Sequence, residues 1–263
     1  MPEVKFPNVW GRFVRWLNQH QRIARPIVLA IALFVYLLVV PASIRSVFWE
    51  GILSDPILTT MLLVFSALVI SLIWSTGQRI DAWTFLLFNV RGSRPVWLDR
   101  VMSGFTQLGN GITALGIAVV FFLAGNRLVA YQLVLGTVTL WLVVELLKFA
   151  VHRSRPFLRL AEARIVGARA IGRSFPSGHT SQIFFMATMI VQHFHLNVWV
   201  ALLLYAVAFL VGITRMYVGA HYPRDVLAGA ILGSAWGLFG AIIDGPINGA
   251  GEGAGGFGGY FIG

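Results

Sequence analysis

Residues 129–156 read VAYQLVLGTVTLWLVVELLKFAVHRSRP, an apolar run that ends in a cluster of cations. Residues 129–150 are mostly apolar and supply the roughly 20 residues that a helix needs to cross a bilayer. Lys148 lies near the end of this run, and Arg155 and Pro156 follow after six more residues. Ionisable groups in or beside a membrane helix are costly and by default mark function. The stretch therefore predicts a spanning helix that carries cations to a site at one membrane face.

The composition of the whole chain is typical of a membrane protein. Of its 263 residues, 57% are hydrophobic and only 11% are charged, whereas soluble domains carry about 25% charged residues. Apolar runs of spanning length lie at 27–47, 57–75, 109–125, 129–150, 180–196, 198–214 and 226–244. The last run contains four glycines, which membrane helices tolerate where they pack against neighbours. We therefore predict an all-α, polytopic membrane helix bundle.

The two ends of the chain differ from these spans. Within residues 1–25, the apolar residues fall on one helical face and Arg12, Arg15 and Arg22 lie largely opposite, which predicts an amphipathic helix at the membrane interface. Residues 245–263 are rich in glycine and show no periodic apolar face, which predicts a flexible tail. The membrane-embedded domain is therefore expected over 27–244.

The charge balance is strongly basic and narrows the possible partners. Twenty Lys plus Arg against ten Asp plus Glu give a formal charge of +10. In so hydrophobic a chain, this excess favours lipid headgroups or phosphate groups as partners over nucleic acid. The absence of cysteine excludes disulfides, thiolate catalysis and Cys-ligated metals. No internal repeat is visible, so an inverted-repeat transporter gains no support.

Two further polar motifs are expected at the same membrane face as Lys148. Residues 174–182 read SFPSGHTSQ and precede an apolar run, and residues 214–225 read TRMYVGAHYPRD between two apolar runs. If the candidate spans alternate in direction, the fourth and the sixth end at the face where the fifth and the seventh begin. All three motifs should therefore meet in one place.

The cations of these motifs suit the binding of phosphate. Lys148, Arg155 and Arg215 can surround a phosphate dianion, and the planar fork of arginine matches its oxygens. The backbone N–H groups of Ser177 and Gly178 precede a predicted helix and would add an anion cradle. Since these groups can supply the charge stabilisation, the reaction needs no metal.

The motifs also contain the groups that phosphoryl transfer needs. Of His179 and His221, one can attack phosphorus while the other donates a proton to the leaving oxygen. Asp225 can hold the ring of His221 in the required tautomer. This set indicates phosphoryl transfer through a phosphohistidine.

Together, K-x6-RP, PSGH and R-x5-H-x3-D resemble the three-part signature of the type 2 phosphatidic acid phosphatase family, over roughly 57–244. The resemblance implies a six-helix membrane phosphatase core, to which 27–47 would add one N-terminal spanning helix. It implies that His221 is the nucleophile, Asp225 its orienting partner and His179 the general acid. The implied phosphate ligands are Lys148, Arg155, Ser177, Gly178 and Arg215. It implies neither a cofactor nor a metal.

The expected function is that of an integral membrane phosphatase acting on a lipid phosphate or pyrophosphate. Phosphatidylglycerophosphate, phosphatidic acid, undecaprenyl pyrophosphate and lipid A phosphate are all candidate substrates. A lipid phosphotransferase with the same phosphohistidine and, in another class, an anion transporter are the alternatives. The oligomeric state stays open.

The placement in the cell membrane can be predicted only in part. Outside the predicted spans, nearly all Lys and Arg fall on the catalytic face, with only Arg45 and Arg127 opposite. This pattern favours a cytoplasmic site in the inner membrane, provided that 27–47 spans it; a re-entrant or interfacial 27–47 would move the N-terminus to the other side and make the count less one-sided. Bacterial members of the family that act on lipid phosphates commonly face the periplasm. Residues 1–25 and the stretch 77–104, with Trp83, Phe85, Phe88 and Trp97, together form a candidate lid at the headgroup level.

Several charged residues near the motifs have more than one interpretation. Glu145 lies one turn before Lys148 and is a candidate structural partner for it. Between 153 and 173 the chain has more arginines than one phosphate needs, and we expect the surplus at an anionic lipid surface or in a solvated loop. These arginines are Arg153, Arg159, Arg164, Arg169 and Arg173.

Overall fold

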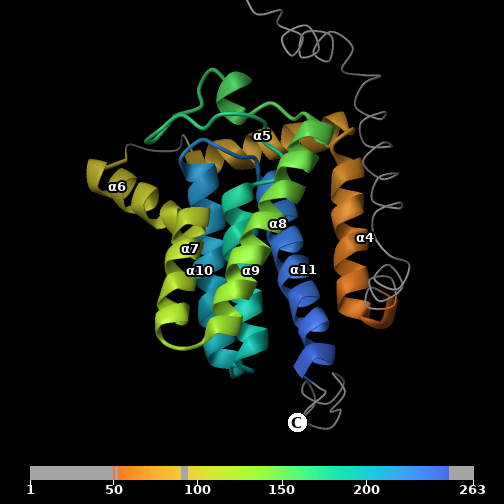
Figure 1. The fold of residues 1–263 in the computed structure, drawn as a ribbon. Helices are drawn as coiled ribbons and strands as arrows, with labels where there is room; N and C mark the ends of the chain where they lie inside the picture. The colour runs from red at the N-terminus through yellow and green to blue at the C-terminus, as the bar shows by residue number, and fades with distance from the viewer. Residues whose placement is uncertain (1–49, 51–52, 90–93, 249–263) are drawn as a thin grey trace, which may run out of the picture. The chain divides into compact units, whose positions relative to one another are not determined.

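The computed structural model describes residues 50, 53–89 and 94–248, and all regular elements in these ranges are helices (Figure 1). This confirms the all-α prediction. The α-helices are α4 (Pro56–Ser71), α5 (Ser75–Asn89), α6 (Val96–Phe105), α7 (Gly111–Leu123), α8 (Arg127–Val151), α9 (Gly178–His193), α10 (Val198–Tyr217) and α11 (Pro223–Asn248). Two 3₁₀-helices, η1 (Thr106–Gly109) and η2 (Pro156–Leu158), link them. The predicted amphipathic helix over 1–25 and the span over 27–47 lie outside the described residues.

Each of the six candidate spans within the described ranges coincides with a helix. By length and composition, two elements in the described part of the chain can cross a membrane alone: Arg127–Leu158, which contains α8, and Val198–Tyr217. Two bent pairs would raise this number to four if each is one broken span: α4 with α5, bent by 98°, and α6–η1 with α7, bent by 60°. The number of crossings therefore stays a prediction. At its C-terminal end, α11 continues to Asn248, so the tail predicted from 245 begins with four helical residues.

Polar side chains at the N-cap position determine where several helices begin. Asp55 accepts hydrogen bonds from the backbone N–H groups of Ile57 (2.8 Å) and Leu58 (3.0 Å) at the start of α4. Three asparagines, Asn110, Asn126 and Asn197, cap α7, α8 and α10 in the same way. Such caps satisfy N–H groups that have no partner within the helix. The Ncap residue of α9, Ser177, makes no such bond.

Glycines bring α11 close to α9. Gly229, Gly233 and Gly237 are spaced by four residues and therefore share one helical face. A Cβ added to Gly233 would lie 2.1 Å from the carbonyl oxygen of Ser181, and one on Gly229 would lie 2.7 Å from that of Ser177. Small residues allow such close approach of helix backbones, as expected for this glycine-rich span. The packing sets the first turn of α9 beside the start of α11.

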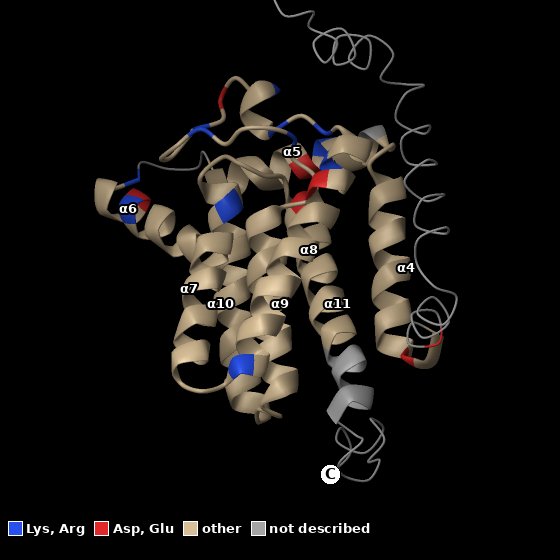
Figure 2. Ribbon diagram, viewed as in Figure 1, with Lys and Arg blue, Asp and Glu red and all other residues tan. Residues whose placement is uncertain are grey.

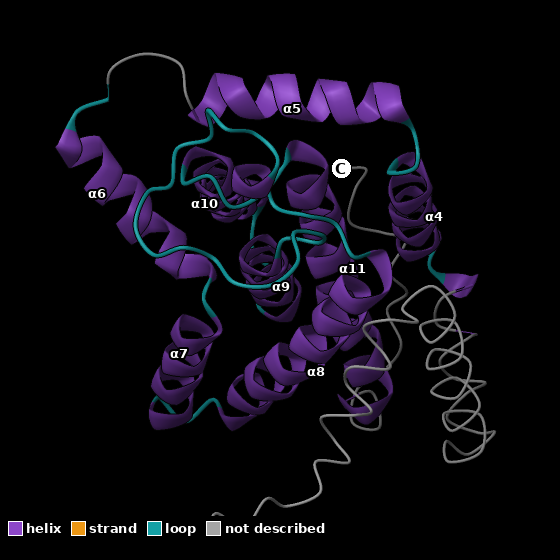
Figure 3. Ribbon diagram, turned by 90° about the horizontal axis from the view of Figure 1, so that it is seen from above, coloured by secondary structure: helices purple, strands orange, loops and turns teal. Residues whose placement is uncertain are grey.

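Charged side chains gather at one end of the bundle. Most of the Lys, Arg, Asp and Glu residues in the described ranges lie at this end, around the last turns of α8 and the loop that follows it (Figure 2). Helix α5 lies across the same end, and the loop between α8 and α9 runs over the ends of the neighbouring helices (Figure 3). The three polar motifs belong to this end.

Candidate active site

The three motifs of the sequence meet at the charged end of the bundle. Nη1 of Arg155, from the loop after α8, lies 3.2 Å from Nε2 of His221, which lies between α10 and α11. The N–H of Ser177, directly before α9, donates to the carbonyl oxygen of Asp225 over 2.9 Å. The alternation of spans therefore predicted the meeting of these motifs correctly.

The ring of His221 is held through Nδ1, and its other nitrogen, Nε2, faces the guanidinium of Arg155. Nδ1 lies 2.7 Å from the carbonyl oxygen of Ser174. Because a carbonyl can only accept, Nδ1 carries the proton and Nε2 presents a lone pair. The residue lies in the loop between two helices and is 2% exposed. Burial lowers the pKa of His221 to about 3, although Asp225 opposes the shift. The ring is therefore neutral and nucleophilic near pH 7.

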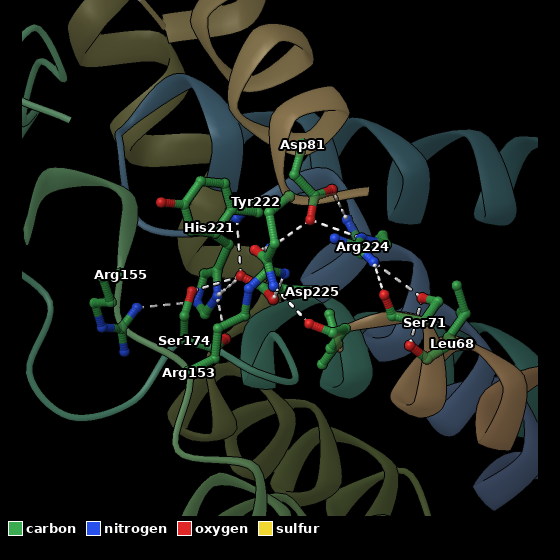
Figure 4. A network of polar contacts seen from close by, with 12 residues as sticks. Leu68, Ser71, Asp81, Arg153, Arg155, Ser174, His221, Tyr222, Arg224 and Asp225 are labelled. Carbon is green, nitrogen blue, oxygen red and sulfur yellow. Dashed lines mark hydrogen bonds and ion pairs between the residues drawn. The ribbon is translucent and has the colours of Figure 1, made fainter. Parts of the chain in front are cut away.

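Asp225 supports His221 mainly through Ser174. Oδ2 of Asp225 lies 3.8 Å from Nδ1 of His221, which is too long for a hydrogen bond. The carboxylate instead accepts a hydrogen bond from the hydroxyl of Ser174 and another, over 2.9 Å, from the backbone N–H of Tyr222 (Figure 4). The sequence suggested direct contact between Asp225 and the ring, but in the structure the carbonyl of Ser174 takes the ring proton.

Arg155 reaches His221 with its charge uncompensated. Its guanidinium donates to the carbonyl oxygens of Ile171 (2.8 Å), Gly172 (3.1 Å) and Ala220 (3.0 Å). Among the described residues, no carboxylate forms an ion pair with it. Neutral acceptors fix the fork but leave its full charge available to an anion.

Arg215 and His179 line a cavity of about 210 Å³ beside this cluster. Nη1 of Arg215 donates to the hydroxyl of Thr106 in η1 over 2.7 Å, and its buried Nε has no hydrogen-bond partner. Arg169 and Gln107 also line the cavity. Arg215, a second cation without a carboxylate partner among the described residues, and His179, the predicted general acid, therefore line the same cavity.

Lys148 lies at the edge of the cluster and pairs with the predicted partner. Its Nζ is 2.7 Å from Oε1 of Glu145, so this expectation is confirmed. The same Nζ would lie 3.9 Å from a Cβ built on Gly178. The amine of Lys148 thus lies close to Gly178, the first residue of α9, while it also forms an ion pair with Glu145.

The start of α9 offers fewer N–H groups to an anion than the sequence suggested. The N–H of Ser177 is occupied by the carbonyl of Asp225, and its hydroxyl accepts from Thr180 over 2.9 Å. An anion cradle at this place would therefore use the N–H groups of Gly178 and His179, at the positive end of the helix. The expectation that the N–H of Ser177 takes part differs from the structure.

Comparison with known proteins identifies the family. A family model described as the PAP2 superfamily matches residues 129–245. The bacitracin transport permease protein BcrC of Bacillus licheniformis is 34% identical over 165 residues, covering 61% of this chain and 78% of that protein. The chain belongs to the PAP2 superfamily. An undecaprenyl-diphosphatase of Sulfolobus acidocaldarius is 26% identical over 176 residues, covering 66% and 84% of the two chains.

A solved structure agrees with this membership. The transmembrane PAP2-type phosphatidylglycerolphosphate phosphatase from Bacillus subtilis superposes with a TM-score of 0.61 at 27% identity, covering 72% of this chain and 96% of the other. The resemblance found in the motifs is thereby confirmed. The protein is a membrane lipid phosphatase of the PAP2 superfamily.

Several residues of this PAP2 site were missed by reasoning from sequence. Ser174 lies in the second motif and Thr106 in η1, outside all three motifs, and neither hydroxyl was expected to take part. Arg153 was expected at a lipid surface or in a solvated loop, but it is only 8% exposed and forms ion pairs with Asp225 and Asp81. The sequence offered one signal of this pairing. Acids are scarce in the chain, and each carboxylate that is buried needs a cation as its partner.

Proposed function

We propose that this PAP2 phosphatase hydrolyses a phosphomonoester or pyrophosphate of a membrane lipid through a phosphohistidine on His221. One observation carries the proposal: Nε2 of His221 presents a lone pair to an uncompensated guanidinium in a buried site. Nucleophilic attack needs such a lone pair, and the developing phosphoryl charge needs such a cation.

The reaction would proceed in two displacements. Nε2 of His221 forms a bond to phosphorus as the bond from phosphorus to the lipid oxygen breaks, and His179 gives that oxygen a proton. A water molecule then attacks phosphorus and returns a proton to His179, while the bond to nitrogen breaks and releases inorganic phosphate. The ring of His179 must carry a proton at the start of this cycle, because only the protonated ring can act as the acid.

The phosphate ligands follow from the distribution of charge. Arg155 now donates to Nε2, so the phosphoryl group would insert between the two and take over this hydrogen bond. Arg215 from the cavity and Lys148 from the edge would meet its other oxygens. The N–H of Gly178 supports this cage at the α9 terminus.

Lipid access is proposed from the end of the bundle where α5 and α6 lie. Trp83 on α5 and Trp97 on α6 are 63% and 64% exposed, and exposed tryptophans favour the headgroup level of a bilayer. Phe85 was expected in the same lid, but it is 0% exposed and packs against Tyr222. Replacement of the two tryptophans by alanine should reduce activity toward long-chain lipids more than toward short-chain ones. If the alanine variants lose the same fraction of activity on long-chain and short-chain lipids, these tryptophans do not form a lid.

The site is proposed at the cytoplasmic face of the cell membrane, on the strength of the charge pattern. Because the chain has no cysteine, Ile171→Cys, at a position 92% exposed in the loop after η2, gives a single label site on the catalytic side. Ala124→Cys, between α7 and α8, is the matched control for the other side. An impermeant maleimide should label only Ala124→Cys in intact cells, and the reverse pattern would place the site outside.

Phosphate release tests the proposed function. Detergent-purified protein is given phosphatidylglycerophosphate, phosphatidic acid, undecaprenyl pyrophosphate or lipid A, with EDTA present. We expect turnover of at least one lipid and a loss of about a hundredfold or more in His221→Ala and His179→Ala, with the exposed Arg127→Gln as control. Histidine variants as active as the wild type would contradict the proposal.

The two alternatives give different products in the same preparation. A phosphotransferase would yield a second phosphorylated lipid in place of inorganic phosphate. One relative carries the name of a transport permease, and a transporter would accumulate phosphate in proteoliposomes without cleaving any lipid.

A further inference from the structure

A chain of buried ion pairs extends from Asp225 away from the phosphate-binding cations. Arg153 donates from Nη1 to Oδ1 of Asp225 over 2.6 Å and from Nη2 to Oδ2 of Asp81 on α5 (Figure 4). Asp81 also accepts a hydrogen bond from Nε of Arg224 over 2.7 Å. Arg224 in turn donates to the carbonyl oxygen of Ser71 at the end of α4 over 2.6 Å. The charges therefore alternate in sign from the site to α5.

Arg153 holds both groups that surround the ring of His221. Its side chain binds Asp225, and its backbone carbonyl accepts the N–H of Ser174 over 2.9 Å. Ser174 is the residue whose own carbonyl takes the ring proton and whose hydroxyl binds Asp225. The guanidinium also lies 4.3 Å from the ring centre of Tyr222, next to His221 in sequence. A shift of Arg153 would therefore move both supports together.

The charge of Arg153 is not available to the substrate. Two carboxylates accept from it, and both are nearly inaccessible, with Asp81 2% and Asp225 0% exposed. Arg153 lines a separate cavity of about 500 Å³ between the start of α5 and the loop after α8, whereas His179 and Arg215 line the smaller one. It can thus act on the reaction only through other residues.

We propose that Arg153 and Asp81 are positioning residues for His221, an inference that rests on the proposed function of that histidine. Arg153 fixes Ser174 and Asp225, which hold the ring with Nε2 toward the phosphate. Asp81 fixes Arg153 and connects α5, the helix across the end of the bundle, to the nucleophile. A misplacement of about 1 Å at a reacting group can cost on the order of a hundredfold in rate.

The test compares Arg153→Gln, Arg153→Lys and Asp81→Asn with Arg79→Gln, an exposed arginine on the same helix as Asp81. The lipid that the wild type cleaves fastest serves as substrate, and orthovanadate serves as a probe of the phosphate cage. We expect kcat to fall about tenfold to a hundredfold in Arg153→Gln and Asp81→Asn. KM and the inhibition constant of orthovanadate should stay within about threefold of wild type, because the phosphate ligands are untouched.

Two further comparisons sharpen the test. Arg153→Lys keeps the charge between the carboxylates and should recover part of kcat. The double variant Arg153→Gln with Asp81→Asn should be no slower than the slower single variant, because the two residues act as one unit.

Three outcomes would overturn the proposal. Wild-type kcat in Arg153→Gln or Asp81→Asn would show that the network does not reach the nucleophile. A parallel loss of orthovanadate binding would make Arg153 a phosphate ligand. Loss of the folded, monodisperse protein in Arg153→Lys as well as Arg153→Gln would reduce the network to a structural role. Failure of the proposed function would be recognised by a different result: His221→Ala would then be as active as the wild type in the same assay.

Discussion

Arg153 and Arg155 lie two residues apart in one loop, yet their surroundings differ in charge. Arg153 is bound by two carboxylates, whereas the acceptors of Arg155 are three backbone carbonyls and the Nε2 of His221. Both are buried. An arginine neutralised by carboxylates supports structure, while one held by neutral groups keeps its charge for an incoming anion. The identity of the acceptors, more than burial, distinguishes the two roles.

The same division applies to a second pair of arginines. Arg224 shares the carboxylate of Asp81 with Arg153, and Arg215 donates to a hydroxyl, that of Thr106. The PAP2 site therefore contains a compensated region around Asp81 and Asp225 and an uncompensated region around Arg155 and Arg215. Arg155→Gln and Thr106→Asp alter the uncompensated region, Arg153→Gln alters the compensated region, and Arg164→Gln alters neither.

The largest effect is expected from Arg155→Gln, which removes an uncompensated cation beside the nucleophile. We expect kcat/KM to fall by about a hundredfold to a thousandfold, the cost of losing one well-placed transition-state donor. Orthovanadate inhibition should weaken as well, because the cation also binds the ground-state anion. Steady-state kinetics on the preferred lipid measures both. Arg155→Lys keeps the charge but loses the planar fork of donors, so its kcat/KM should lie between those of the wild type and Arg155→Gln.

This result would separate Arg155 from its neighbour. Arg153→Gln should lower kcat with little change in orthovanadate binding, and Arg155→Gln should lower both. If the two variants behave alike, the acceptors do not determine the role of an arginine in this loop.

A smaller effect is expected from Thr106→Asp, which places a carboxylate beside Arg215 and so compensates it. Orthovanadate inhibition should weaken by about tenfold to a hundredfold, since the anion then competes with a fixed charge. Thr106→Ser keeps the hydroxyl and is the matched control. Unchanged inhibition in Thr106→Asp would mean that Arg215 does not face the phosphate.

The smallest effect is expected from Arg164→Gln, in the half-exposed pair with Asp99. Nη1 of Arg164 lies 2.8 Å from Oδ2 of Asp99, and the side chains are 34% and 26% exposed. Exposed ion pairs contribute about 1 kcal/mol or less, so the melting temperature in detergent should fall by a few degrees at most. Activity should stay within about twofold of wild type. A loss of activity as large as that in Arg155→Gln would extend the site to this pair.

The features that follow from periodicity and spacing could be predicted from the sequence. The apolar runs predicted the helices, and their alternation brought Lys148, His179 and His221 to one end. The four glycines in 226–244 indicated that this helix packs against a neighbour, and in the structure this packing places Ser177 beside Asp225. Local patterns of this kind depend on neighbours within a few turns, which the sequence displays directly.

The contacts that cross long separations could not be predicted in the same way. Asp81 and Arg153 are 72 residues apart, and no local pattern pairs them. The carbonyl of Ser174 orients His221 through backbone geometry, which the side-chain identity does not encode. The N–H of Ser177 was expected at the phosphate, but the approach of α11 supplies it with a carbonyl. These contacts depend on how the helices pack in three dimensions.

Trapping of the phosphoenzyme tests the central claim most directly. The wild type is mixed with its preferred lipid and quenched in alkali within the first turnover, because phosphohistidine is stable in base. Trypsin then releases residues 216–224, which contain His221 as their one histidine, for mass spectrometry. We predict one phosphoryl group on His221 in the wild type and none in His221→Ala. Phosphate release without phosphoryl on this peptide, or with phosphoryl on His179, would contradict the mechanism.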